Sequence, residues 1–189
     1  MIGLLRRRVM GGGGNENPLP PGYTPIQYLS VENGNYYVDT GIVTKLSSTY
    51  KFVTKAMFYT VVNTKRQLIG NLYEPWFGCD KGKFSYSGLI TPSTPAKSTS
   101  FSANTWYDIN VSAPSKSNAS HRLLVFTVGN QGTSISPNAT YQCQMAIKSF
   151  YDIYENDVLV RHMIPCKNSN NINGMFDLID NEFHPLTSY

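Results

Sequence analysis

Residues 50–62 read YKFVTKAMFYTVV, a run dominated by aromatic and β-branched residues with stretches of apolar–polar alternation. Alternation with a period of two residues is typical of a strand that buries one face. A helix would need apolar residues every three to four positions, and no 12-residue window of the chain has that spacing. The sequence therefore predicts a β protein.

The same strand pattern returns along the rest of the chain. Further strands are predicted at 106–111, 123–128, 143–153 and 158–164, with a hairpin at 77–86. Gly82 supplies the positive φ that the hairpin turn needs. The loops expected between strands are rich in Ser, Thr, Asn, Pro and Gly, and they cover 91–105, 113–120 and 129–140. Many short antiparallel strands separated by turns predict an all-β, two-sheet antiparallel sandwich of jelly-roll type.

The composition agrees with this fold class. The chain has 189 residues, enough for one domain that needs no metal or disulfide to fold. Only 15% of the residues are charged, 13% are aromatic, and 50 are Asn, Ser or Thr. Hydroxyls, amides and rings suit strands and long loops better than helix bundles. The aromatic content also excludes disorder for most of the chain.

The net charge of +4 is divided unevenly. Residues 1–22 carry half of it, and the remaining residues are almost neutral. The body therefore lacks the basic face that binding to a nucleic acid needs. No run approaches 18 apolar residues, so no membrane span is expected. The apolar residues precede the arginines at the N-terminus, which is the reverse of a secretory signal.

The first 22 residues are predicted to form an arm separate from a body at 23–189. Gly11 to Gly14 make a flexible joint, and Pro18, Pro20 and Pro21 make a stiff extended spacer. The decamer before the joint is either a dangling tail or an anchor that orders on a partner, and we predict the anchor. Its contact residues would be Ile2, Leu4, Leu5, Arg6, Arg7 and Arg8.

The three cysteines, Cys79, Cys143 and Cys166, lie far apart and form no CxxC motif. A zinc ribbon and a thioredoxin-like motif are therefore excluded. At most one disulfide can form, and we expect all three thiols to be reduced and mostly buried.

Several segments together resemble a known family. They read GYTPIQYL (22–29), NYYVDTGI (35–42), NTWYDI (104–109), KSFYDIY (148–154), VLVRHMIPC (158–166) and GMFDLIDNEFH (174–184). In this order they are similar to the concanavalin A-like, laminin-G-like jelly-roll domains of gut-bacterial surface proteins and tailed phages. The sequence departs from that pattern at His162, where an acidic residue is commoner, and at Gln27, where the family has Glu.

Most of the matched residues are expected to be structural. The residues predicted to face the core are Tyr28, Tyr37, Ile42, Trp106, Phe150, Ile153 and Ile164. Arg161 is predicted to form a buried ion pair with Asp152 or Asp177 that ties the last strands together.

Enzymatic activity is not expected. Because the resemblance extends to a fold that also includes glucanases, glycoside hydrolysis has to be considered. The ExDxxE-like strand of those enzymes has no counterpart here. Two acid pairs have i, i+2 spacing, Glu155 with Asp157 in a predicted hairpin turn and Asp180 with Glu182 in the closing segment. Glycoside hydrolysis therefore ranks last among the functions considered. A nucleophilic pair of His162 and Cys166 is also unsupported, because no third group orients it.

Glycan binding through exposed rings is the better-supported activity. Apolar faces of a pyranose stack on aromatic rings, and nearby amides and carboxylates fix its orientation. The predicted ligand-binding residues are Asn71, Tyr73, Trp76, Asp80 and Tyr86, with packing in the core or at an interface as the alternative. No cofactor is expected, and one structural calcium ion, bound by oxygens of the loops, is left as an open alternative. Its donors would be Asp80, Asn71, Asn168, Asn170, Asn171 and Asn173.

These observations and the resemblance together imply a non-enzymatic virion protein of a tailed phage. Residues 1–22 would attach it to other virion proteins, and the jelly roll would be displayed on the capsid or tail, where it touches host glycans. Several copies in a symmetric set are expected, on the virion surface, with no nucleic acid or membrane as partner. The alternative is a carbohydrate-binding module on a bacterial cell surface.

Overall fold

A computed structural model describes residues 18–32, 36–59, 66–70, 76–80, 82–115, 121–127 and 144–188. Across these residues the chain forms strands and turns and no helix, so no helix there is long enough to cross a membrane. Every strand pairing described is antiparallel. The predicted all-β antiparallel class is confirmed.

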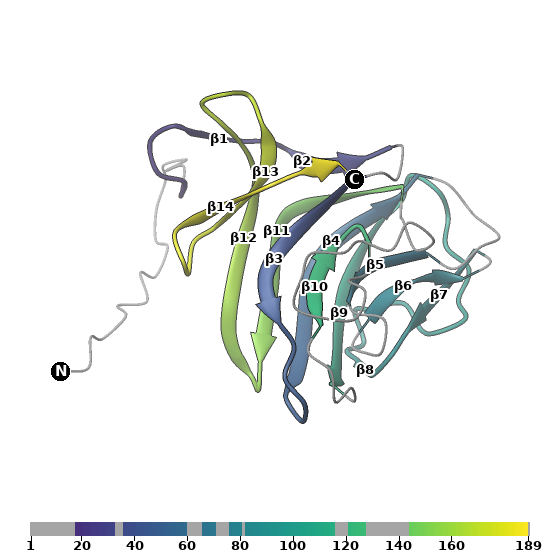
Figure 1. Cartoon of the computed structure of the whole chain (residues 1–189). Coiled ribbons are helices and arrows are strands. Elements are labelled where there is room, and N and C mark those ends of the chain that lie inside the picture. The colour runs from purple at the N-terminus through teal and green to yellow at the C-terminus, as the bar shows by residue number, and fades with distance from the viewer. Residues whose placement is uncertain are drawn as a thin grey trace, which may run out of the picture.

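The larger sheet has nine strands within the described ranges. They are β1 (Tyr23–Pro25), β2 (Tyr28–Val31), β4 (Thr49–Phe58), β8 (Leu89–Ile90), β9 (Trp106–Pro114), β11 (Met145–Glu155), β12 (Val158–Asn168), β13 (Asn173–Asp177) and β14 (Glu182–Pro185). Their order is β14-β13-β12-β11-β4-β9-β8, and the short β1 and β2 pair with β12 and β11 (Figure 1). The long central strands β4, β9, β11 and β12 match four of the predicted strands.

The smaller sheet has six strands in the same part of the chain. They are β3 (Tyr36–Val43), β5 (Arg66–Gly70), β6 (Trp76–Asp80), β7 (Lys83–Tyr86), β10 (Arg122–Val125) and β15 (Thr187–Ser188). Their order is β15-β3-β10-β5-β6-β7. Strands β6 and β7 are the predicted hairpin, and Gly82 in its turn has a φ of 73°.

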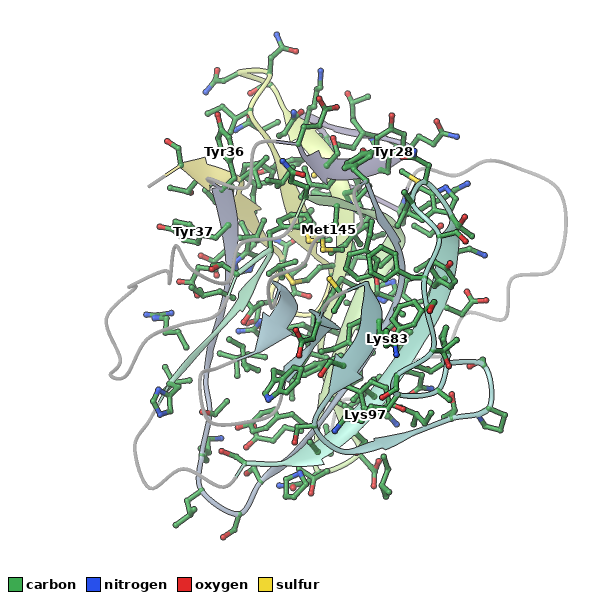
Figure 2. All side chains as sticks on the ribbon, turned by 90° about the vertical axis from the view of Figure 1, so that its right-hand side faces the viewer. Tyr28, Tyr36, Tyr37, Lys83, Lys97 and Met145 are labelled. Atoms are coloured by element: carbon green, nitrogen blue, oxygen red, sulfur yellow. The ribbon has the colours of Figure 1, made fainter. Side chains whose placement is uncertain are left out.

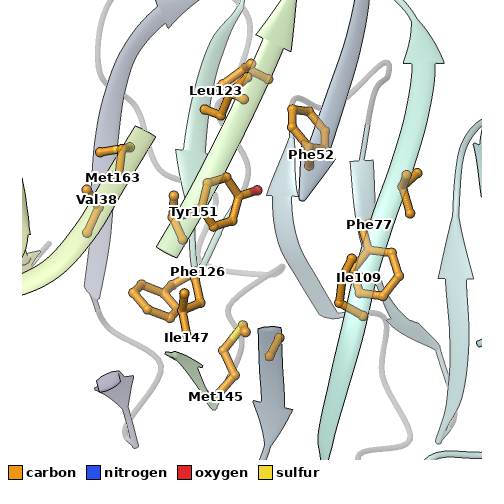
Figure 3. Close-up of a cluster of buried hydrophobic side chains, with 14 of the residues drawn as sticks. Val38, Phe52, Phe77, Ile109, Leu123, Phe126, Met145, Ile147, Tyr151 and Met163 are labelled. Atoms are coloured by element: carbon orange, nitrogen blue, oxygen red, sulfur yellow. The ribbon is translucent and has the colours of Figure 1, made fainter. Parts of the chain in front are cut away.

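The two sheets share one hydrophobic core. Burial alternates strictly along β4, where Tyr50, Phe52 and Phe58 are among the inward residues. They join a single cluster with inward residues of the other sheet, such as Val38 of β3 and Phe77 of β6. Figure 3 shows side chains from both sheets meeting in this core. The arrangement is that of a sandwich, in which apolar faces of two sheets pack together.

A second, smaller cluster lies beside β12 and β13. Leu19, Cys166 and Phe176 are buried in it, and the partly buried Tyr23 and Phe183 pack against them. The ring of Tyr23 lies 4.6 Å from that of Phe176 and 5.4 Å from that of Phe183, measured between centroids. We call this set the Leu19 cluster. The packed body therefore begins by Leu19, four residues before the predicted boundary at Tyr23.

Two of the predicted core residues are confirmed, since Ile42 and Ile153 belong to the main core. Tyr28 is instead 41% exposed, because Leu29 and Val31 are the inward residues of β2 and their neighbours face outward. Trp106 is half-buried beside Tyr28, with ring centroids 6.1 Å apart, rather than in the core.

Phe150, Tyr37 and Ile164 are also only half-buried. Phe150 and Ile153 are three positions apart on one strand, so they face opposite sides of the sheet. Ile164 packs against the Leu19 cluster instead of the main core.

Candidate functional site

Tyr86, one of the predicted glycan-binding residues, is a core residue. It pairs with Phe77 across the β6–β7 ladder, is 6% exposed, and stacks on the Phe77 ring at 6.0 Å between centroids. Its hydroxyl accepts a hydrogen bond from the backbone N–H of Lys97 at 2.8 Å. The ring therefore has no face free for a sugar, and Tyr86 is removed from the predicted site.

Trp76 and Asp80 lie on the opposite face of the same hairpin. Side chains alternate along β6, so the inward Phe77 and Cys79 leave Trp76, Gly78 and Asp80 on the outward face. Trp76 is half-buried and Asp80 is exposed. The structure thus places two of the five predicted residues on one face, and Asn71 and Tyr73 fall outside the described residues.

Arg161 forms the predicted ion pair and joins the two sheets. Its Nε lies 3.4 Å from Oδ2 of the fully buried Asp177, and its Nη1 contacts Asp180. The same Nε–H donates to the backbone carbonyl of Thr40 on β3 at 2.9 Å. Arg161 on β12 therefore contributes a charged link between the larger and the smaller sheet.

Asp152, the other predicted partner of Arg161, pairs instead with His162. Nδ1 of His162 lies 2.5 Å from Oδ1 of Asp152, and the two residues face each other across the β11–β12 ladder. The hydrogen bond to Asp152 raises the pKa of His162 above its ordinary value, and burial opposes this only in part. His162, which departs from the family pattern, thus still forms an ion pair when it is protonated.

The pair of His162 and Asp152 predicts that the free energy of unfolding depends on pH. Because the folded pKa of His162 is raised, its stabilisation is complete below the unfolded pKa of about 6.5. The stabilisation is lost as the pH rises through the folded pKa. Between pH 6 and pH 8 the free energy of unfolding should fall by about 1 kcal/mol, the range for a partly exposed charged hydrogen bond.

Urea unfolding of the wild type and of His162→Gln at several pH values measures this effect. The substitution should remove the decrease between pH 6 and pH 8, and Asp152→Asn should do the same. An equal decrease in both variants and the wild type would assign the effect to other groups.

Glu155 has a structural role rather than an acid–base role. Burial alone would raise its pKa, but hydrogen bonds from Ser48, Lys45 and Tyr50 outweigh it, so the pKa is lowered. Its neighbour Asp157 is 93% exposed in the predicted hairpin turn, where it contacts Lys51 at 3.6 Å. The two carboxylates therefore pair with different cations, Glu155 with Lys45 and Asp157 with Lys51.

Cys166 and His162 do not form a nucleophilic pair. They are four positions apart on the extended strand β12, which separates their Cα atoms by about 13 Å. Burial raises the pKa of the Cys166 thiol to about 11, although a backbone hydrogen bond from Phe176 partly opposes this. A thiol in this environment stays protonated at neutral pH and is a poor nucleophile. Cys79 is likewise free and buried, as predicted, and Cys143 lies outside the described residues.

In the asparagine loop after β12, the side-chain oxygen of Asn168 is used internally. Oδ1 of Asn168 accepts backbone hydrogen bonds from Asn170 and Ile172, each at 3.0 Å. Asn171 has a φ of 60°, which this tight turn requires of it. Within the described ranges no group of three or more His, Cys, Asp or Glu side chains is placed to hold a metal. The structural calcium therefore stays a prediction.

The predicted contact residues of the arm, Ile2, Leu4, Leu5 and Arg6 to Arg8, lie outside the described residues. What the structure adds is the point at which the arm joins the body, since Leu19 is 7% exposed in the Leu19 cluster.

Comparison with known proteins found no matching family model, no matching curated protein and no matching solved structure.

Proposed function

We propose that the chain is a non-enzymatic structural protein of a tailed-phage particle. Its N-terminal arm attaches it to other virion proteins of the capsid or tail. Its body is a concanavalin A-like jelly roll, displayed at the virion surface in several symmetric copies, and it contacts glycans of the host. Neither a cofactor, a nucleic acid nor a membrane is part of this function.

The observation that carries the proposal is how the least exposed carboxylates among the described residues are used. The side chains of Asp39, Asp152, Asp177 and Glu155 are each at most 21% exposed, and each is paired with an arginine, a lysine or, for Asp152, the ring of His162. An acid–base pair for hydrolysis would need such carboxylates free to meet a substrate. The described surface offers instead rings with polar neighbours, which favours binding over catalysis.

The attachment point supports the display role. Leu19 and Tyr23 fix the end of the arm to β12 and β13, so the preceding residues start from a defined place on the body. An apolar and basic peptide held in this way can dock on an acidic or apolar shell through guanidinium–carboxylate bonds.

Purified particles of the phage that encodes the chain provide the test. Mass spectrometry should find the chain in them, and a variant that lacks residues 1–17 should be absent from the particles although it remains folded in the lysate. The deletion ends before Leu19 so that the body is left intact. Particles without the wild-type chain would overturn the proposal, and recovery of the chain on bacterial cell surfaces would favour the surface module.

A further inference from the structure

A hollow of about 360 Å³ lies at the end of the body opposite the β3–β4 turn. It is lined by Ser30, Val31, Glu32, Tyr36, Asn173 and Leu186, which come from β2, β3, β13 and the link between β14 and β15. Its volume is within the range of sites for small ligands. None of the residues predicted from the sequence to bind glycans lines it.

The lining combines one ring, one carboxylate and one amide over an apolar floor. Tyr36 is 37% exposed, and Glu32 and Asn173 are exposed as well. Val31 is buried, and Leu186 packs against the main core, so both are held in place from below. A pyranose needs this set, because its apolar face stacks on a ring while polar side chains bind its hydroxyls.

More rings continue from the hollow along β2. Tyr28 is 41% exposed and lies beside Trp106, over which Nζ of Lys148 is held 5.6 Å from the ring centroid. The Ser30 hydroxyl, between Tyr28 and Glu32, hydrogen-bonds the phenol of Tyr59. At about 3.3 Å per residue, Tyr28 and Glu32 are about 13 Å apart, so a ligand that reaches both is an oligosaccharide.

Figure 2 shows Tyr28 and Tyr36 at the same end of the molecule, with Lys83 well away from them. Lys83 is the neighbour of Asp80 in the β6–β7 ladder. The hollow therefore lies away from the Asp80 end of β6, and Trp76 is not among the described residues that line the hollow.

We infer that this hollow, extended by Tyr28 and Trp106, binds a neutral oligosaccharide, an inference that rests on the proposed glycan contact. Tyr36 stacks on one pyranose, Glu32 and Asn173 bind its hydroxyls, and Tyr28 stacks on a later unit. Among the described residues that line the hollow, Glu32 is the one that carries a charge, so an acidic unit stacked on Tyr36 is repelled, while Lys148 of the extension lies over the Trp106 ring.

The test titrates the full chain by calorimetry with maltotetraose, cellotetraose, α-mannotetraose and chitotetraose, and with trigalacturonate as the acidic probe. We expect at least one neutral probe to bind and trigalacturonate not to bind. Tyr36→Ala should lower the affinity for the probe that binds about tenfold, because the stacking contact is lost. Tyr36→Phe should retain the affinity to within about twofold, because the ring remains.

Further variants complete the design. Glu32→Gln should weaken the binding of the neutral probe about fivefold, because a bond to a charged acceptor becomes a bond to a neutral one. Lys83→Ala, at an exposed residue away from the hollow, should leave the affinity unchanged, and unaltered thermal unfolding shows that each variant is folded. Binding abolished by Trp76→Ala but not by Tyr36→Ala would overturn the inference and leave glycan contact standing. Absence of binding to every probe would overturn the inference, while the presence of the chain in particles is decided separately by mass spectrometry.

Discussion

Replacement of Arg161 by alanine is expected to lower the free energy of unfolding by about 3–5 kcal/mol, the cost of removing one partner of a buried ion pair. Asp177 is fully buried, and its Oδ1 accepts backbone hydrogen bonds from His162 and Ile179 at 2.8 and 3.1 Å. Arg161 supplies the positive charge opposite its Oδ2. Without the guanidinium, the carboxylate of Asp177 remains inside the protein without its arginine partner, and the link to Thr40 of the other sheet is lost.

Urea unfolding at pH 7 measures the effect, with Lys55→Ala as the matched control. Lys55 pairs with Asp108 at 3.5 Å, but both side chains are largely exposed, so its loss should cost at most about 0.5 kcal/mol. Arg161→Lys should recover only part of the stability, because a single ammonium cannot replace both Nε at Asp177 and Thr40 and Nη1 at Asp180. A change of less than 1 kcal/mol in Arg161→Ala would show that water replaces the guanidinium at Asp177.

Strand β4 follows from the sequence because stretches of it alternate between apolar and polar residues. The pattern of residues 50–58 is reproduced by the burial of β4, and the turn at Gly82 lies where a positive φ was required. The Arg161 ion pair was also predicted, although with two acids to choose from. Asp152 was excluded only by the register, which places it opposite His162 and so faces it away from Arg161.

The predictions for Tyr28, Trp106 and Tyr86 were wrong because the size of a residue is a poorer guide to its burial than its position in the alternation of a strand. Tyr28 and Trp106 are large and apolar enough to suggest burial, yet the inward positions of β2 belong to Leu29 and Val31. Tyr86 shows the reverse error, because its pairing with the inward Phe77 already assigns it to the core. With the hairpin correctly predicted, this period-two rule was available from the sequence alone.

The hollow at Tyr36 was beyond sequence reasoning for a different reason. Ser30 and Glu32 are more than 140 positions from Asn173, and what brings them together is the tertiary arrangement, in which β2 and β13 of the larger sheet meet β3 of the smaller sheet around the hollow. No local pattern encodes such a meeting of distant segments. The Leu19 cluster is a similar case, since the proline-rich composition around Leu19 suggested a free spacer rather than a packed segment.

Deletion of residues 1–25 is expected to destabilise the body by about 3–5 kcal/mol, whereas deletion of residues 1–17 should leave its stability unchanged. The longer deletion removes Leu19 and Tyr23 from the Leu19 cluster and strand β1 from the edge of β12. A buried leucine contributes about 1.5–3 kcal/mol, and the two ring contacts of Tyr23 add about 0.5–1.5 kcal/mol each. Urea unfolding of the two shortened chains against the full chain gives the difference.

The reactivity of the Cys166 thiol provides an independent measure of whether deletion of residues 1–25 opens the Leu19 cluster. Cys166 is fully buried in the Leu19 cluster, and burial is what raises its pKa from 9.0 to about 11. If deletion of residues 1–25 uncovers the thiol, a return of the pKa to its ordinary value increases the thiolate at pH 8 about 100-fold. Mass spectrometry after brief alkylation should then find Cys166 modified and Cys79, in the main core, protected. Equal labelling of Cys166 in the full chain and in both shortened chains would mean that residues 18–25 do not cover it, and the body would then begin at Ile26, which packs against the main core.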